Sequence, residues 1–170
     1  RFSGGHINPA VTVSAVVARK MGLTKGIMYV VAQLVGAAAG ALLLASVIPT
    51  AIQGTLGAHS LAGGIDANTG LLIEAVLTFF LVFVIFATAM DPKGPTNLAP
   101  IAIGLVVLVD HFVGVTLTGA SMNPARSFGP ALAANEWASH WVYWVGPILG
   151  GSVAACLYEE VFLRRHKETA

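Results

Sequence analysis

The stretch GASMNPARSFG, residues 119–129, places an Asn, a Pro and an Arg within four positions of an otherwise strongly apolar chain. Asn is a preferred helix N-cap, and Pro is favoured at the first helical position because its missing N–H would have no partner there. The stretch therefore predicts a helix that begins at Pro124. A second stretch, GGHINPAVT at residues 4–12, repeats the tripeptide and predicts a helix from Pro9.

The composition around these motifs is that of an integral membrane protein. Hydrophobic residues make up 56% of the chain and charged residues only 10%, and the mean hydropathy is +0.79, far outside the range of soluble domains. Four apolar runs are long enough to cross a bilayer, which takes about 20 helical residues: residues 25–48, 71–90, 98–117 and 137–163. Buried helices of a soluble protein are the alternative, but so many apolar runs leave too little polar surface to cover them.

Both helices that begin at an Asn-Pro-Ala motif are too short to cross a membrane. Helix-forming sequence ends near Ala18 and Ala134, so each helix is about 16 Å long, half of a bilayer core. Irregular backbone at that depth is tolerated only where it is buried in protein or lines a watery cavity. We therefore expect such a cavity to be lined by loop carbonyls from Gly4, Gly5, His6, Gly119 and Ser121.

Positive charge sets the expected orientation, because Lys and Arg in short loops are retained on the cytoplasmic side. Of the nine Lys and Arg residues, eight fall before or at the first residue of the first run, between the second and third runs, or after the fourth. The C-terminus is therefore predicted to be cytoplasmic. The ninth cation, Arg126, falls on the opposite side, and its place directly after a motif points to a role other than that of an exposed loop residue.

An internal repeat links the two motifs. Sliding the chain on itself superimposes the two Asn-Pro-Ala tripeptides, and the matches continue with Tyr29 on Tyr143 and Gly36 on Gly150. Because the charge pattern places the motifs on opposite sides of the membrane, the repeat is predicted to be inverted. The second copy has two apolar runs before its motif and the first has none, so two further spans, six in all, are expected in the complete protein.

In an inverted repeat the two short helices meet N-terminus to N-terminus near the midplane of the membrane. Their positive dipole ends and the amides of Asn8 and Asn123 then face one point. We expect that point to repel cations.

With its paired motifs, the GGHINPAVT and NPARS contexts and the inverted repeat, the chain resembles the aquaporin (major intrinsic protein) family over essentially its whole length. The resemblance implies an all-α membrane protein, a right-handed bundle with four full spans and two half-helices. It implies a single transmembrane channel domain over residues 1–170, with the end of the first repeat in 1–48 and the second repeat in 70–163. It also implies a homotetramer with a separate water pore in each subunit.

The resemblance assigns the motif residues to the pore: Asn8, Pro9, Ala10, Asn123, Pro124 and Ala125. Each Asn would donate an amide N–H to the oxygen of a passing water and turn the hydrogens of that water outward. This orientation breaks the chain of hydrogen bonds along which protons hop. Water would pass and protons would not.

The same resemblance implies a selectivity filter at the extracellular end of the pore, formed by Arg126, His111, the carbonyl of Ala120 and a residue outside this sequence. Relatives that conduct glycerol usually carry Gly at the position of His111 and Asp after the Arg, where this chain has Ser127. These differences favour a water-selective filter, although the small Ala120 leaves room for ammonia. The alternative for His111 is an interior histidine that has no role in the filter.

Two acidic residues lie within the apolar runs, where ionisable groups are costly and need partners. The resemblance makes Glu74 a structural support that accepts N–H bonds from the loop before the second motif, rather than a proton relay. Asp110 precedes His111, and adjacent helical residues point about 100° apart. Asp110 is therefore expected to face the outer vestibule or a neighbouring subunit.

Other classes of function find little support in the sequence. No nucleophile with a base and no metal-ligand spacing indicates an enzyme, and no set of intramembrane carboxylates indicates an ion-coupled transporter. The net charge of +1 provides no basic surface for a nucleic acid, and no cofactor or metal is expected. We predict a passive water channel, with a glycerol or ammonia facilitator and a non-conducting structural member of the family as alternatives.

Overall fold

The structure is a computed structural model that describes residues 4–163. The C-terminal cations Arg164, Arg165 and Lys167, on which part of the predicted orientation rests, lie outside these residues. The described part of the chain is helical and contains no strand. Its α-helices are α1 (Pro9–Val17), α2 (Leu23–Val47), α3 (Ala67–Ile85), α4 (Ala99–Gly114), α5 (Pro124–Ala134) and α6 (Val142–Tyr158). A short 3-10 turn, Thr50–Ile52, follows α2, and α3 and α6 each end in a wider π-helical turn, Phe86–Met90 and Glu159–Leu163.

The four predicted spans correspond to α2, α3, α4 and α6. Within residues 4–163, three helical segments are long and apolar enough to cross a membrane, namely Leu23–Val47, Ala67–Met90 and Val142–Leu163. The fourth, α4, is shorter at 16 residues, because it ends at Gly114, where the chain turns into the loop before the second motif. The two predicted half-helices are confirmed as α1 and α5, each of which begins at the Pro of its motif.

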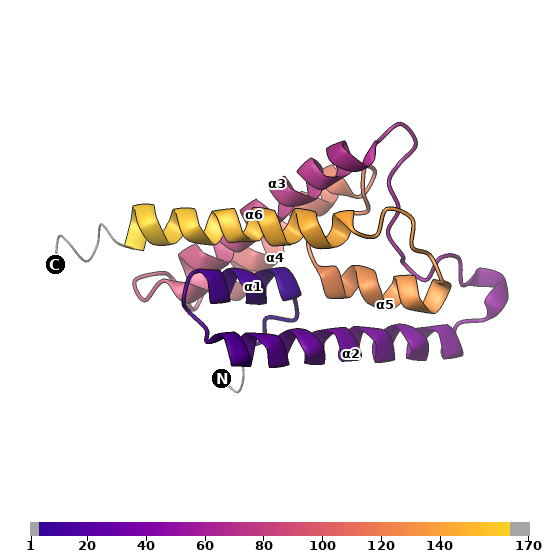
Figure 1. The fold of residues 1–170 in the computed structure, drawn as a ribbon, viewed down its shortest axis with the longest axis horizontal. Helices are drawn as coiled ribbons and strands as arrows, with labels where there is room; N and C mark the ends of the chain where they lie inside the picture. The colour runs from indigo at the N-terminus through magenta and orange to yellow at the C-terminus, as the bar shows by residue number, and fades with distance from the viewer. Residues whose placement is uncertain (1–3, 164–170) are drawn as a thin grey trace.

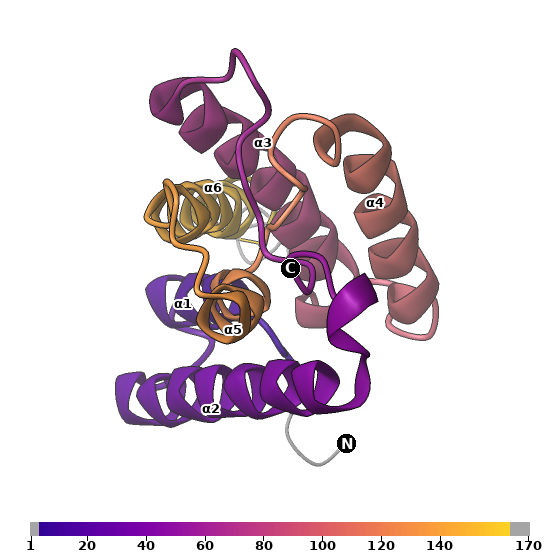
Figure 2. The ribbon, with the colours of Figure 1, turned by 90° about the vertical axis from the view of Figure 1, so that its right-hand side faces the viewer.

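The two half-helices lie in line between α2 and α6. Figure 1 shows α1 and α5 following one another between these longer helices, and Figure 2, turned by 90°, shows α5 end on in front of α1. α1 packs mainly against α6, and α5 packs mainly against α2. Each half-helix thus packs against the span that follows the other half-helix in the chain. An inverted repeat predicts this arrangement.

Close packing of α3 against α6 depends on a glycine. A Cβ added at Gly150 would overlap the backbone carbonyl of Ala75, so only Gly allows the two helices to approach this closely. The repeat partner of Gly150 is Gly36 on α2, where a Cβ would meet no atom within 4 Å. Only 6% of the apolar window of α2 is buried, against 39% in the spans that contain α3 and α6. The face of α2 that matches the contact face of α6 is therefore not covered by any described residue of this chain.

Valine substitutions at the two repeat positions are expected to have unequal effects. Gly150→Val forces α3 and α6 apart and should lower the free energy of unfolding by about 1–3 kcal/mol, the usual cost of overpacking. Gly36→Val is the matched control and should change it by less than about 0.5 kcal/mol. Thermal unfolding of the purified variants in detergent checks both values. In this 170-residue chain, equal losses would contradict an uncovered face of α2. In a protein that carries a further span on that face, equal losses are expected.

Candidate functional site

Each half-helix begins with an Asn side chain that caps it. The Oδ1 atom of Asn8 accepts a hydrogen bond from the backbone N–H of Ala10 at 2.8 Å. The Oδ1 atom of Asn123 accepts from the N–H groups of Ala125 and Arg126, at 3.0 and 3.3 Å. Since these are the N–H groups that a helix start leaves without partners, the Asn residues and the Pro residues that follow define where α1 and α5 begin.

The same two Asn side chains join the half-helices to each other. The Nδ2 amide of Asn8 donates to the carbonyl of Met122 at 2.8 Å, and the Nδ2 amide of Asn123 donates to the carbonyl of Ile7 at 2.9 Å. A primary amide has two N–H donors, so each Asn retains a second N–H for another acceptor. The N-termini of α1 and α5 therefore meet with one spare donor from each side.

Backbone conformation is also repeated in the two loops. Ile7 and Met122, which precede the Asn residues, have positive φ angles of 51° and 53°. Positive φ is unfavourable for side-chain-bearing residues, and most of all for a β-branched one such as Ile7. The strain is borne at the two positions whose carbonyls accept the Asn amides, as is typical of functional sites that the surrounding structure holds in place.

A buried carboxylate holds the second loop. Glu74 of α3 has no exposed surface, and its oxygens accept hydrogen bonds from the hydroxyl of Thr118 at 2.6 Å and from the N–H groups of Ser121 and Met122 at 2.9 and 2.8 Å. The hydroxyl of Tyr143 donates to the carbonyl of Thr118 at 3.0 Å. All of these contacts fix the loop that leads to Asn123.

One cavity, of about 410 Å³, runs beside the meeting point of the half-helices. Part of its wall is polar and carries His6, Asn8, His111, Ser121, Asn123 and Arg126. The remaining wall is apolar and carries Ile7, Val11, Leu81, Ile85, Ile103, Val107 and Met122. A cavity lined by both polar and apolar groups suits a small molecule that exchanges hydrogen bonds as it passes.

The structure brings together most of the residues that the sequence singled out. The two Asn residues, His6, His111, Ser121 and Arg126 line the cavity. The prolines and alanines of the motifs are buried in the first turns of their helices. Gly4, Gly5, Gly119 and Ala120 are not among the residues that line this cavity, and the role of their carbonyls stays a prediction.

The ring of His111 is oriented by its own helix. Its Nδ1 atom lies 2.8 Å from the carbonyl of Val107. A carbonyl only accepts, so Nδ1 carries the proton in this contact, and Nε2 of the neutral ring is left as an acceptor. His111 is thus anchored to the backbone and also lines the cavity.

His59 is a site residue that sequence reasoning missed. It is only 6% exposed, and its Nδ1 atom lies 2.9 Å from the hydroxyl oxygen of Ser127 and 3.4 Å from a guanidinium nitrogen of Arg126. Burial, and secondly the charge of Arg126, lower the pKa of His59 from 6.5 to about 3. The ring is therefore neutral near pH 7. It comes from the connector between α2 and α3, where no spacing or periodicity distinguishes it.

Asp110 does not face outward, as we expected from the sequence. It is 4% exposed, and its Oδ2 atom is buried without a hydrogen-bond partner in the part of the chain that the structure describes. Gly114, four residues later on the same face of α4, abuts Leu77 of α3. Asp110 therefore points toward α3 instead of toward the vestibule or a neighbouring subunit.

One family model matches most of the chain. The family model described as major intrinsic protein matches residues 1–158. The chain belongs to the major intrinsic protein family. Family membership makes it an integral membrane protein and confirms that it is not an enzyme.

Individual members of the major intrinsic protein family match nearly the whole chain. Aquaporin-4 of Mus musculus is 49% identical over 162 residues, which is 95% of this chain and 50% of the relative. Aquaporin TIP4-4 of Zea mays is 48% identical, over 95% of this chain and 64% of the relative. The chain thus spans about half the length of the aquaporin-4 sequence.

A solved structure confirms the fold class. The X-ray structure of the aquaglyceroporin from Plasmodium falciparum superimposes with a TM-score of 0.83 and covers 98% of this chain and 76% of that chain. The two sequences are 23% identical, so this likeness concerns the fold alone.

Proposed function

We propose that the protein is a passive water channel that excludes protons and ions. The observation that carries the proposal is the pair of reciprocal hydrogen bonds by which Asn8 and Asn123 join two helix N-termini beside one cavity. Relatives named aquaporin support the same function.

Proton exclusion follows from the donors at this point. The amides that remain on Asn8 and Asn123 both donate, so a water between them accepts twice through its oxygen and points its hydrogens away. Two helix N-termini add positive potential at the same place. A water molecule held in this way cannot pass a proton to the next water molecule. A cation at the same point is repelled.

The filter is formed by Arg126 and His111, with His59 as a further member. The guanidinium is charged at all relevant pH values and donates hydrogen bonds in a fixed geometry. His59 and Ser127 contact each other beside it, which restricts where the guanidinium can lie. The acceptor Nε2 of His111 and the donors of Arg126 together offer a polar solute both kinds of hydrogen bond. Ala120, which is fully buried, would contribute its carbonyl.

A glycine substitution at His111 tests the water-selective filter against the glycerol alternative. His111→Gly removes an imidazole from the cavity wall, so glycerol uptake should rise by about tenfold or more if steric exclusion there is worth at least about 1.4 kcal/mol. Stopped-flow light scattering of proteoliposomes under a glycerol gradient measures this rate. Phe112→Gly, at an exposed neighbouring position, is the control. Unchanged glycerol uptake in His111→Gly would remove His111 from the filter.

The burial of a neutral His59 predicts acid sensitivity of the fold. Its pKa of about 3 in the folded protein lies below the ordinary 6.5, so the unfolded chain binds an extra proton between these values. Stability is therefore expected to fall as the pH drops from about 6.5 toward 3. His59→Asn should flatten this decline in thermal unfolding measured across the pH range, and Ser60→Ala, an exposed neighbour in the same connector, should not. An acid decline that is equally steep in both variants would contradict the assignment.

We further propose that one more pair of spans completes the pore and that subunits form a homotetramer. The uncovered Gly36 face of α2 supports a helix there that is equivalent to α3. In that arrangement residues 1–48 end the first repeat and residues 70–163 form the second. The cation pattern supports a cytoplasmic C-terminus. Labelling of single cysteines introduced at Lys93 and Gln53, in sealed vesicles, tests this orientation because only one of them should react from outside.

A further inference from the structure

Asp110 is a buried ionisable residue that the chemistry of the pore does not use. The buried residues of α4 are Ala99, Asp110 and Gly114. Asp110 is 4% exposed, and its Oδ2 atom has no hydrogen-bond partner among the residues that the structure describes. A buried polar atom without a partner is rare in a native protein. An ionisable group of this kind inside a membrane span points to a function.

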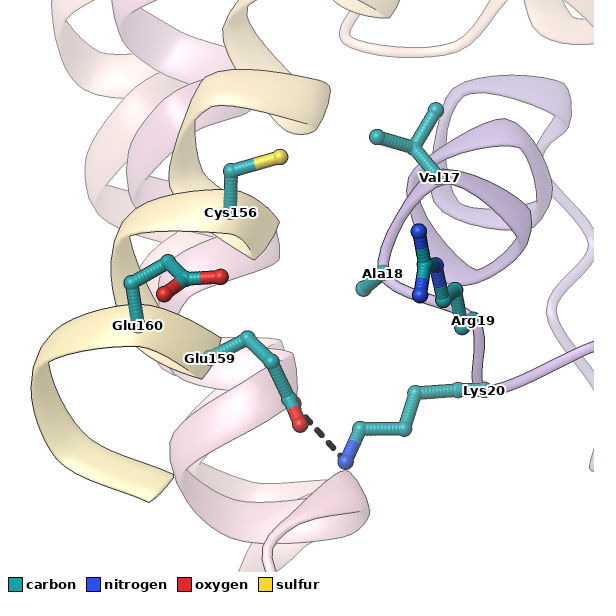
Figure 3. A pocket seen from close by; sticks show the side chains of 7 residues that line it. All are labelled: Val17, Ala18, Arg19, Lys20, Cys156, Glu159 and Glu160. Carbon is teal, nitrogen blue, oxygen red and sulfur yellow. Dashed lines mark ion pairs between the residues drawn. The ribbon is translucent and has the colours of Figure 1, made fainter. Parts of the chain in front are cut away.

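Charged groups at the ends of the helices are paired instead. Figure 3 shows Lys20, just beyond the end of α1, reaching Glu159 at the end of α6, and the nitrogen and oxygen atoms are 2.7 Å apart. This ion pair joins α1 to α6. Among residues 4–163 Asp110 has no such ion pair.

The surroundings of Asp110 disfavour a negative charge. Val106 and Gly114 lie one turn before and one turn after it on the same face of α4. Val106 packs against the buried apolar cluster, and Gly114 abuts Leu77 of α3. The one ionisable residue of α3 is Glu74, which is also acidic, and the π-helical turn after α3, which α4 also contacts, carries none. A buried carboxyl group without a cation or a donor is most stable in its neutral form.

The position of α4 determines the position of His111 in the filter. The ring of His111 is held by its own helix, through the contact between Nδ1 and the carbonyl of Val107. Arg126 lies on α5, which packs mainly against α2, whereas α4 packs mainly against α3. The separation of His111 from Arg126 therefore depends on how α4 is seated on α3, and Asp110 lies in that contact.

We propose that Asp110 is a positioning residue of the filter, which carries a proton in the selective channel and whose ionisation at alkaline pH turns His111 out of the cavity wall. This inference rests on the proposed water channel. An ionised Asp110 requires water, and the cavity that α4 helps to line is the one that contains His111. Adjacent helical residues point about 100° apart, so a rotation of α4 that brings Asp110 to this cavity moves His111 away from it. Glycerol exclusion is then lost while water conduction continues.

Infrared spectroscopy tests the protonation of Asp110 without reference to conduction. The C=O stretch of a protonated carboxyl group absorbs at a higher frequency than the stretches of a carboxylate. The difference between the spectra of the wild type and Asp110→Asn should contain this band at neutral pH and lose it at alkaline pH. The range from about pH 5 to about pH 9 covers the titration of buried carboxyl groups. A carboxylate throughout this range, or a protonated group throughout it, would overturn the proposal.

The pH dependence of glycerol uptake tests the effect on the filter. In wild-type proteoliposomes uptake should rise about tenfold between neutral and alkaline pH, the same factor that is expected for His111→Gly. Asp110→Asn keeps a neutral side chain of the same shape, so its uptake should stay low at every pH. His59, His111 and Arg126 are unchanged in this variant. A rise that survives in Asp110→Asn would belong to those groups and would overturn the role of Asp110.

Asp66→Asn is the matched control for Asp110→Asn. Asp66 is an exposed residue that caps α3, and Asn caps a helix equally well, so this variant should show the wild-type rise. Asp110→Leu is a second neutral variant of similar volume, which should also remove the rise and serves if Asp110→Asn fails to fold.

Water conduction measured in the same vesicles separates this inference from the proposed function. A wild-type protein that conducts no water at any pH would contradict the water channel, and the infrared band would still decide the protonation of Asp110. A wild-type protein that conducts water and excludes glycerol equally at every pH would contradict the role of Asp110 alone.

Discussion

Replacement of Glu74 by alanine is expected to disorder the second half-helix loop and to abolish water conduction. The substitution leaves the donors of Thr118, Ser121 and Met122 buried without an acceptor. Each unsatisfied buried donor costs about 1–3 kcal/mol, so the free energy of unfolding should fall by at least about 3 kcal/mol. Thermal unfolding in detergent and osmotic shrinkage of proteoliposomes measure the two effects.

The controls for this substitution lie on the same helix. Leu72→Ala, at an exposed position of α3, also shortens a side chain but should leave stability and conduction close to the wild type. Glu74→Gln retains one acceptor oxygen but turns an NH₂ group toward a donor, so an intermediate loss is expected. If Glu74→Ala conducted water at the wild-type rate, Glu74 would not be the support of this loop.

Replacement of Arg126 by valine is expected to make the protein permeable to small cations. A unit charge about 7 Å from a passing cation, at an effective dielectric constant of about 20, contributes on the order of 2 kcal/mol to the barrier. Removal of this charge should raise cation permeation by a factor of about 30. Currents in voltage-clamped oocytes, with sodium or protons as charge carriers, provide the measurement.

Arg126→Lys is the informative comparison for the valine variant. It keeps the charge but loses the planar fork, so cations should stay excluded while the contact with His59 is altered. Lys93→Val, which removes a cation far from the cavity, should produce no current. Absence of current in Arg126→Val as well would mean that the helix ends and the two Asn amides exclude cations without help from the filter.

The parts of this structure that sequence predicts are those with a local physical cause. An Asn followed by Pro encodes a helix start, so both half-helices begin where expected, and apolar runs locate the spans to within a few residues. The place of His59 beside Arg126 depends on the path of a long connector, which no local pattern encodes. The direction of Asp110 was misjudged because the sequence gives the angle between neighbouring side chains but not the rotation of the whole helix.

The hydrogen bonds between the half-helices also constrain how the chain can be made. Asn8 donates to Met122, a residue 114 positions later, and the ribosome delivers the partner only after α2, α3 and α4 have been synthesised. Until then α1 has no second half-helix to contact in the middle of the membrane. We expect α1 to stay near the membrane surface during biogenesis and to enter its final position late. Crosslinks between the two loops should therefore form only after residue 123 has left the translocon.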